Sequence, residues 1–315
     1  MIPLAEIEAA RERIRGAAIR TPLVRLEADA PAEIWLKLEN LQPIGSFKLR
    51  GAANAVRSAP AERLADGIAT ASAGNMAQGV AWVARELGLR ATIVVPEHAP
   101  QTKLDAIARL GGEVVKVPHA RWWRALVDGR TDDAPGFFVH PVQDDAVMAG
   151  NGTIGLELAE DLPDADAVLV PWGGGGLTTG IASALAQVAP RVAVHAVEPE
   201  TGAPLAAALA VGAPTEIDYV PSFVDGAGSP ALLPAMWERA RPLLAGAHAV
   251  SLDDTAAAVR LLAERARIVA EGAGALALAA ALAGRVPGRK LVCVVSGGNI
   301  DSPRLAEILA GRTPA

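Results

Sequence analysis

Short apolar segments that alternate with helical segments constrain the fold of this chain most strongly. Apolar runs of strand length cover residues 67–71, 91–95, 113–117 and 136–139, and a second series covers 167–170, 192–197 and 291–295. Segments of helical periodicity lie between the runs, notably 75–87 and 101–110. This order predicts an α/β fold in which parallel strands are covered by helices.

The chain is long enough for more than one folding unit. A length of 315 residues favours two lobes or one large α/β unit, and the two series of strands fit two lobes. No flexible linker rich in glycine, serine or charge divides them. The sequence therefore does not mark a sharp boundary between the two lobes.

Composition and charge point to a small ligand. Hydrophobic residues make up 51% of the chain but aromatic residues only 3%, so alanine, valine, leucine and isoleucine must fill the core. The net charge of −6 comes with no basic run, which argues against nucleic acid or an anionic membrane surface as a partner. Apolar stretches are broken by glycine, proline or charge, so we expect no membrane partner.

Cysteine usage and the amino terminus favour a cytoplasmic location. Cys293 is the one cysteine and lies inside an apolar run, where a buried structural thiol is the better interpretation. The first residues carry acidic side chains and no long apolar stretch after a basic region, unlike an export signal or a transit peptide.

A lysine follows a turn near the amino terminus. Pro43 and Gly45 indicate a turn, Ser46 is a candidate helix N-cap, and Lys48 falls in the first helical turn. The helix dipole there disfavours a positive charge and lowers the pKa of the amine, as a Schiff-base lysine requires. On this segment alone, a solvated surface lysine is the simpler interpretation.

Four successive glycines, residues 173–176, follow the strand 167–170 directly and precede a helix expected from Leu177. Such a loop lets backbone N–H groups converge on an anion at a helix N-terminus. The loop lacks the lysine and hydroxyl residue of a Walker motif and the spacing of a dinucleotide fold. We therefore favour a phosphate-binding loop over a merely tight turn.

Two further turns follow buried strands. Ser296 stands at the carboxyl end of the strand 291–295, where doubly wound sheets gather ligand contacts, although a simple helix entry explains it equally well. The turn 72–76 combines a hydroxyl, an amide and free N–H groups that suit a carboxylate. By itself it could equally be a capping turn.

Taken together, these turns resemble one family: the threonine and serine dehydratases with serine racemase, which share the tryptophan-synthase-β type of pyridoxal-phosphate fold, fold type II. The resemblance covers nearly the whole chain, and its order and spacing are specific. The matching segments are 38–52, 72–80, 150–157, 173–176, 271–276 and 296–299.

The resemblance implies a role for each candidate residue. Lys48 would hold pyridoxal 5'-phosphate as a Schiff base and act as the catalytic residue. The other implied cofactor contacts are Phe47 beside the ring, Asn75 at the phenolic oxygen, Gly173, Gly174, Gly175, Gly176 and Leu177 at the phosphate, and Ser296 at the pyridine nitrogen. The implied substrate-binding residues are Ser72, Ala73, Gly74, Asn75 and Met76.

The implied activity is that of a lyase. A neutral serine at the ring nitrogen favours loss of a β leaving group over transamination. The resemblance therefore implies that a 3-hydroxy amino acid such as L-threonine or L-serine is converted to a 2-oxo acid and ammonia, with Lys48 removing the Cα proton. The alternatives are a racemase or a β-replacement enzyme on the same fold, and a non-catalytic phosphate-binding protein.

The order of the motifs predicts how the lobes are built. Lys48 precedes the strands of one lobe, whereas the glycine loop and Ser296 follow them, so a single site requires the chain to leave one lobe and return. We expect a large domain of residues 1–49 and 143–315 and a small domain of residues 50–142, with twisted, parallel-rich sheets and the cofactor between them. The resemblance also implies a homodimer.

Three departures from the family bear on function. Racemases of the family place a serine where this chain has Ala73, and a methyl group cannot donate a proton, so a dehydratase is favoured. Histidine usually stands at the position of Met76. Relatives bind a divalent cation through a glutamate matched by Glu198, but the expected acid is Pro204 here, so we predict no metal.

Two adjacent tryptophans, Trp122 and Trp123, replace a modest helix of the relatives. Neighbouring residues of a helix cannot both face inward, so one of them contacts a partner, the core or the substrate channel. Plain packing is the simpler interpretation. If one reaches the pocket, the substrate could be larger than serine or threonine.

Overall fold

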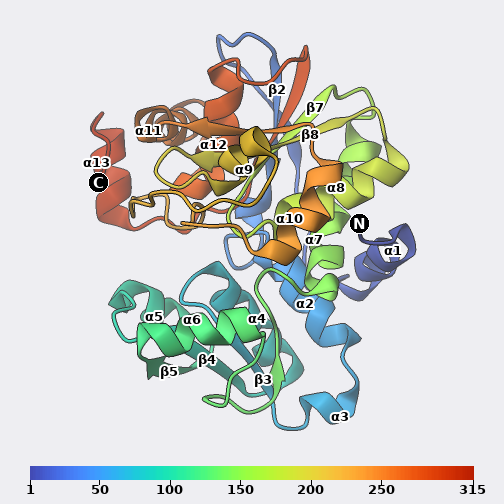
Figure 1. The fold of residues 1–315 in the computed structure, drawn as a ribbon, viewed down its shortest axis with the longest axis vertical. Helices are drawn as coiled ribbons and strands as arrows, with labels where there is room; N and C mark the ends of the chain where they lie inside the picture. The colour runs from blue at the N-terminus through green and yellow to red at the C-terminus, as the bar shows by residue number, and fades with distance from the viewer.

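The computed structural model describes residues 1–315 and contains two sheets, one in each of two lobes (Figure 1). The sheet of the large lobe has the order β1-β2-β10-β7-β8-β9. Its strands are β1 (Leu23–Leu26), β2 (Glu33–Leu38), β7 (Ala167–Pro171), β8 (Ala193–Pro199), β9 (Gly246–Val250) and β10 (Lys290–Val295). Only β1 runs antiparallel to its neighbour.

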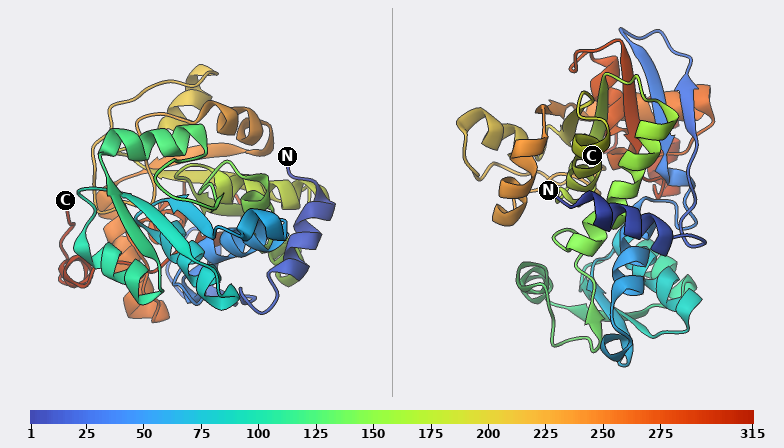
Figure 2. Two further views of the ribbon diagram at one scale, coloured as in Figure 1. Left: turned by 90° about the horizontal axis from the view of Figure 1, so that it is seen from below. Right: turned by 90° about the vertical axis from the view of Figure 1, so that its right-hand side faces the viewer.

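The small lobe holds an all-parallel sheet with the order β5-β4-β3-β6. Its strands are β3 (Ile68–Ala71), β4 (Ala91–Pro96), β5 (Glu113–Val117) and β6 (Phe137–Phe138). All of them lie between β2 and β7 in the sequence, so the chain leaves the large lobe once and returns to it, as Figure 2 also shows.

Helices cover both sheets. In the first half of the chain they are α1 (Leu4–Arg13), α2 (Lys48–Ser58), α3 (Ala61–Leu64), α4 (Asn75–Leu87), α5 (Gln101–Arg109), α6 (His119–Asp128) and α7 (Asp145–Asp161). In the second half they are α8 (Gly176–Val188), α9 (Pro204–Val211), α10 (Pro234–Ala240), α11 (Leu252–Leu261), α12 (Gly272–Leu282) and α13 (Ser302–Leu309). None of them is both long and apolar enough to cross a bilayer.

The large sheet is buried on both faces, as parallel sheets usually are. Along β10, Leu291 and Cys293 pack in the cluster that contains α12, whereas Val292 and Val294 pack in the cluster that contains α8. This alternation follows from the two-residue period of a strand. It explains the continuous apolar run that the sequence shows there, and Cys293 is a buried free thiol as expected.

The small sheet is also covered on both faces. Ile93 of β4 packs in one cluster with residues of α2, α4 and α5, whereas Val94 packs on the other face with Ala125 of α6. Helix α6 thus covers the face of the small sheet opposite to α2, α4 and α5. In Figure 1 it is drawn in the upper part of the small lobe, toward the large lobe.

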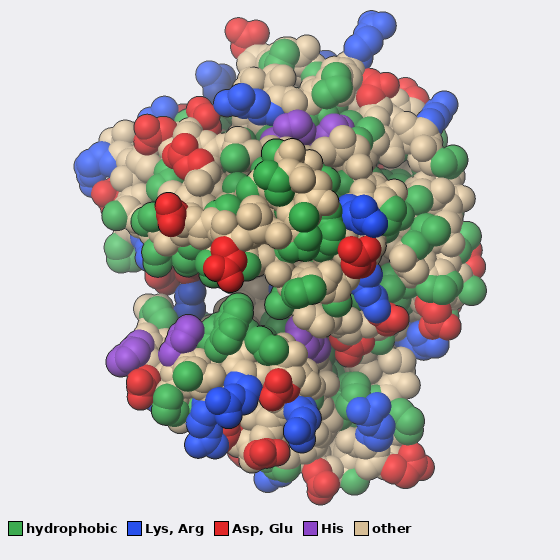
Figure 3. All heavy atoms as spheres, in the orientation of Figure 1, with side chains coloured by type: hydrophobic (Ala, Val, Ile, Leu, Met, Phe, Trp, Pro, Cys, Tyr) green, Lys and Arg blue, Asp and Glu red, His purple; other side chains and the backbone are tan.

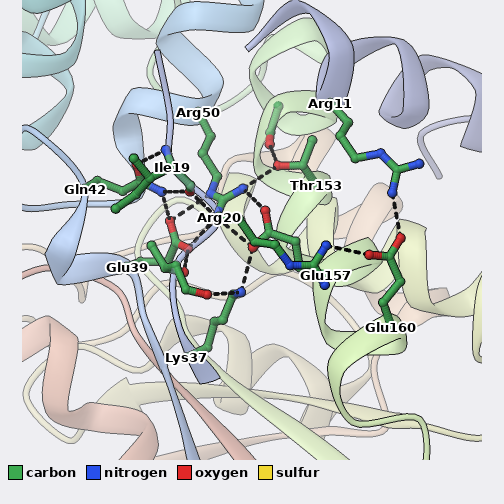
Figure 4. Close-up of polar contacts among 12 residues, drawn as sticks. Arg11, Ile19, Arg20, Lys37, Glu39, Gln42, Arg50, Thr153, Glu157 and Glu160 are labelled. Carbon is green, nitrogen blue, oxygen red and sulfur yellow. Dashed lines mark hydrogen bonds and ion pairs between the residues drawn. The ribbon is translucent and has the colours of Figure 1, made fainter. Parts of the chain in front are cut away.

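A buried ionic network fixes α2 to the large lobe (Figure 4). Arg50 of α2 donates to Glu39 (2.9 Å) and to Glu157 of α7 (2.6 Å), and Lys37 of β2 lies 2.6 Å from the other Glu157 oxygen. All four side chains are almost completely buried. Because α2 begins at Lys48, the network also fixes the start of that helix.

The expected strands and helices occur within about two residues of their predicted bounds, and the α/β prediction is confirmed. Three strands were not predicted: β1, β2 and β9. Charged or small residues interrupt the apolar pattern of each, for example Lys37 in β2 and His248 in β9. The charge of Lys37 is compensated inside the protein by Glu157, which a local pattern does not reveal.

Candidate active site

A cavity of about 510 Å³ lies between the two lobes, where Figure 3 shows the molecule hollowed. Every residue that the sequence singled out for cofactor or substrate lines it. These residues are Phe47, Lys48, Ser72, Ala73, Gly74, Asn75, Met76, Gly173, Gly174, Gly175, Gly176, Leu177 and Ser296. Segments that are far apart in the sequence thus meet at one place.

A short backbone pairing positions Lys48. The Phe47 N–H donates to the Ser296 carbonyl (3.0 Å), and the Gly298 N–H donates to the Gly45 carbonyl (2.9 Å). These bonds hold the start of α2 against the end of β10. The prediction that Ser46 caps α2 is wrong: its hydroxyl has no hydrogen-bond partner, because the residue pairs with Gly297 and lies buried against it.

Lys48 has the environment of a reactive amine. Its Nζ donates to the Pro141 carbonyl (2.8 Å) and lies 5.2 Å from the centroid of the Phe47 ring. Burial lowers the pKa of Lys48 to about 8, although the nearby Glu271 carboxylate acts in the opposite direction. At neutral pH the amine therefore loses its proton far more readily than a surface lysine does.

The glycine loop at the start of α8 presents free donors to the cavity. The N–H groups of residues 173–178 donate to no acceptor of the chain. Free N–H groups at a helix N-terminus form a binding site for an anion. Gly175 has a φ of +93°. A Cβ at Gly174 would lie 2.5 Å from Val142 Cγ2, so the loop has no room for a side chain there.

Three polar side chains form a chain at the rim of the cavity. Asn75 Nδ2 donates to Glu271 Oε1 (2.8 Å), and Asn299 Nδ2 donates to Asn75 Oδ1 (2.7 Å). The amide of Asn75 is therefore fixed in one orientation. Burial, with help from the charge of Asp225, raises the pKa of Glu271 to about 7. No role was predicted for Glu271, although it begins one of the segments that match the family.

The loop 72–76 forms the small-lobe side of the cavity. The Ser72 hydroxyl accepts from the Gly74 N–H (3.2 Å), which shapes the turn before α4. Met76 is 1% exposed, and its side chain packs in the core of the small lobe. Ser296 is buried at the end of β10, across the backbone pairing from Lys48.

Comparison with known proteins identifies the family. Residues 14–297 match the family described as pyridoxal-phosphate dependent enzyme. The chain belongs to this family. An L-threonine ammonia-lyase of Thermotoga maritima is 39% identical over 317 aligned positions, which cover 98% of this chain and 78% of the relative.

Solved structures of the same family have the same fold. The processed threonine deaminase isoform 2 of Solanum lycopersicum superposes with a TM-score of 0.86 at 33% identity, covering 98% of this chain and 87% of that one. Maize serine racemase superposes with a TM-score of 0.87 at 29% identity, covering 98% of each chain. The likeness therefore extends over both lobes.

The residues of the cavity fit pyridoxal phosphate. The unpaired N–H groups at the start of α8 suit its phosphate, and the half-buried amine of Lys48 lines the same cavity. The Ser296 hydroxyl at the end of β10 offers a neutral partner for the ring nitrogen, with no carboxylate at that position. The cavity thus offers N–H donors for the phosphate of the cofactor and an amine for its aldehyde.

Glu198 has another use than metal binding. Its carboxylate accepts from the N–H groups of Leu205 (3.0 Å) and Ala206 (2.8 Å), and Pro204 begins α9 where an acid would be needed. Burial raises the pKa of Glu198 to about 7, while these hydrogen bonds act against that rise. No three histidine, cysteine or acidic residues gather as a metal-ligand group. Because both Glu198 oxygens already accept backbone N–H groups and Pro204 stands in place of an acid, the residues at this position do not fit a divalent cation.

The two tryptophans of α6 face different surroundings. Trp122 lines the cavity, whereas the side chain of Trp123 is 46% exposed. His119, three residues before Trp122, also lines the cavity, and the centroids of the two rings are 5.5 Å apart. Trp122 thus both packs against the core of the small lobe and reaches the cavity, whereas Trp123 does neither.

Proposed function

We propose that this protein is a pyridoxal-phosphate-dependent ammonia-lyase that converts a 3-hydroxy amino acid, such as L-threonine or L-serine, to a 2-oxo acid and ammonia. One observation carries the proposal. The half-buried amine of Lys48 and the free N–H groups of residues 173–177 lie at a single cavity between the lobes. Similarity to threonine ammonia-lyases supports the assignment.

Each part of the cavity has a proposed task. The glycine loop binds the phosphate, and Asn75, oriented by Glu271 and Asn299, donates to the ring oxygen. Free N–H groups of the loop 72–76 bind the substrate carboxylate. Bound pyridoxal phosphate supplies an electron sink for negative charge at Cα. Lys48 takes the Cα proton and holds it at Nζ, which its lowered pKa allows near neutral pH.

Elimination is favoured over racemisation because of Ala73. Racemisation needs an acid on the face of Cα opposite Lys48, and the methyl group of Ala73 donates no proton. Elimination needs no acid on that face.

We further propose a cytoplasmic homodimer with a large domain of residues 1–49 and 143–315 and a small domain of residues 50–142. The return of the chain to the large sheet after β6 supports the division into domains. The family resemblance supports the homodimer. Sedimentation equilibrium of the holoenzyme tests the dimer, and a monomeric mass would contradict it.

The activity is tested with a panel of 3-hydroxy amino acids. The holoenzyme is incubated with L-serine, L-threonine and larger analogues, and 2-oxo acid and ammonia are measured together. We expect equal amounts of both products and little inversion of the recovered substrate. Fast inversion without 2-oxo acid would indicate a racemase instead, and no change in any substrate would refute the proposed activity.

A further inference from the structure

The amino-terminal turn of α6 contributes an aromatic surface to the cavity. His119 and Trp122 are three residues apart, so they share one face of the helix, and both line the cavity together with Lys48. Trp123 is rotated away and exposed. In Figure 3, hydrophobic and histidine side chains gather at the lower rim of the hollow between the lobes.

Packing holds Trp122 in place. Its ring packs against the cluster that contains Val94, Val117 and Ala125 on the small sheet. His119 lies against it at a ring-centroid distance of 5.5 Å and an interplanar angle of 48°. A ring anchored in this way is a fixed wall, because turning it away would expose its apolar contacts to water.

The small-lobe lining of the cavity also includes apolar residues of the segment after β4. Pro96, Ala99 and Pro100 line the same cavity as Trp122, together with His98. The lysine at this side, Lys103, is paired with Asp225 at 2.5 Å. A substrate side chain with a carboxylate would therefore compete with Asp225 for its partner, whereas a flat apolar group would meet matching surfaces.

We propose that Trp122, with His119 beside it, forms the pocket for the substituent on Cβ of the substrate, and that this substituent is aromatic. This inference rests on the proposed ammonia-lyase activity and specifies its substrate class as 3-aryl-3-hydroxy amino acids. In the net reaction the Cα–H and Cβ–O bonds break, so water leaves and an enamine remains. The enamine takes a proton from water at Cβ and becomes an imine. Water then adds at Cα and the C–N bond breaks, so the products are a 3-aryl-2-oxo acid and ammonia.

The test compares L-threo-3-phenylserine with L-serine for the wild-type holoenzyme, Trp122→Ala and the matched control Trp123→Ala. Wild type should have the higher kcat/KM for phenylserine. Trp122→Ala should lower that value about tenfold, mainly through KM, as expected for loss of one aromatic contact. The loss of kcat/KM should be clearly smaller for L-serine than for phenylserine, because the hydroxymethyl group of serine is too small to contact the Trp122 ring. Trp123→Ala should change neither value.

Several results would overturn the inference. One is a wild-type preference for L-serine over phenylserine, and another is an equal loss of both activities in Trp122→Ala. A preference for 3-hydroxyaspartate would show that the pocket selects an acidic group. If L-serine reacts but phenylserine does not, this inference fails while the proposed activity stands. Trp122→Phe, which keeps an aromatic ring and the core packing, should retain most of the phenylserine activity, and its loss there would also count against the inference.

Discussion

Ala73 shows how one methyl group can decide the outcome of a reaction. It lines the cavity in the turn before α4, on the small-lobe side. Ala73→Ser places a hydroxyl where the wild type has no proton donor, so the variant should form measurable D-substrate from L-serine while 2-oxo acid formation continues. Chiral chromatography of the recovered substrate measures this. Ala73→Gly removes the methyl group without adding a donor and should form no D-substrate. If this variant also inverts the substrate, the hydroxyl of the serine variant is not the cause of the inversion.

Glu271 gives a pH-dependent prediction. Its pKa is raised to about 7 by burial in the folded protein, above the ordinary value of 4.5 that it has when unfolded. The unfolded chain therefore releases this proton first as pH rises. The stability that the protonated carboxyl contributes is full below pH 4.5 and is lost as pH rises through about 7.

Glu271→Gln should accordingly remove this loss. We expect the difference in the free energy of unfolding between variant and wild type, both without cofactor, to shift in favour of the variant from pH 4.5 to pH 7. Urea denaturation at several pH values measures it. A difference that is constant with pH would mean that the carboxyl ionises alike in both states.

Motifs predicted the residues of the site, but not their interactions. Lys48 follows a turn, and the glycine loop and Ser296 each follow a buried strand that the sequence displays, and all of them line one cavity. The orientation of Asn75 was not predictable, because it depends on Glu271 and Asn299, each from another part of the chain. The free hydroxyl of Ser46 likewise results from pairing with Gly297, more than 200 residues away.

At the scale of elements, α7 carries a buried and an exposed ion pair only one turn apart. Glu157 is buried with Arg50 and Lys37, whereas the side chain of Glu160 is 46% exposed beside Arg11. Glu157→Ala removes the close carboxylate partner of the buried Lys37 and one of the two carboxylate partners of Arg50, so it should lower the free energy of unfolding by about 3–5 kcal/mol. Glu160→Ala should cost less than about 1 kcal/mol. Urea denaturation of both variants tests this, and similar losses would contradict a special role for the buried network.

Glu198 and α9 give a prediction about metals. Because both Glu198 oxygens accept bonds from the start of α9, Glu198→Ala should destabilise the protein by about 1 kcal/mol, as loss of a helix cap does. Dialysis against a chelator should change neither the melting temperature nor the turnover. A rise in melting temperature on adding Mg²⁺ or Ca²⁺ to wild type, lost in the variant, would show that the carboxylate binds a cation after all.

Elements could be predicted where burial on both faces produces a clear pattern. The apolar runs of β4, β7 and β10 are of this kind. The pattern fails for β2, in which Lys37 is buried, and for the edge strand β9, where His248 is hydrogen-bonded to His195 of β8. In both strands a tertiary partner makes a polar residue tolerable, and that partner is invisible in a local window.

At the scale of the whole molecule, both lobes contribute residues to the cavity that lies between them. The large sheet contributes the glycine loop and Ser296, and the small lobe contributes the loop 72–76 and Trp122. Lys48 lies at the junction, where α2 packs between α7 and α4. The ion pair of Lys103 with Asp225 joins the lobes across the cavity. The order of the motifs predicted that the site lies between two lobes. Which face of α6 lines the cavity could be seen only in the structure.

The most direct test of the central claim is where the cofactor attaches. Borohydride reduction of the holoenzyme followed by peptide mass mapping should place the pyridoxyl group on Lys48, with no label at any other lysine. Lys48→Ala should lose both the label and all formation of 2-oxo acid, while it remains folded by circular dichroism. A reduced cofactor on another lysine, or full turnover by Lys48→Ala, would contradict the account.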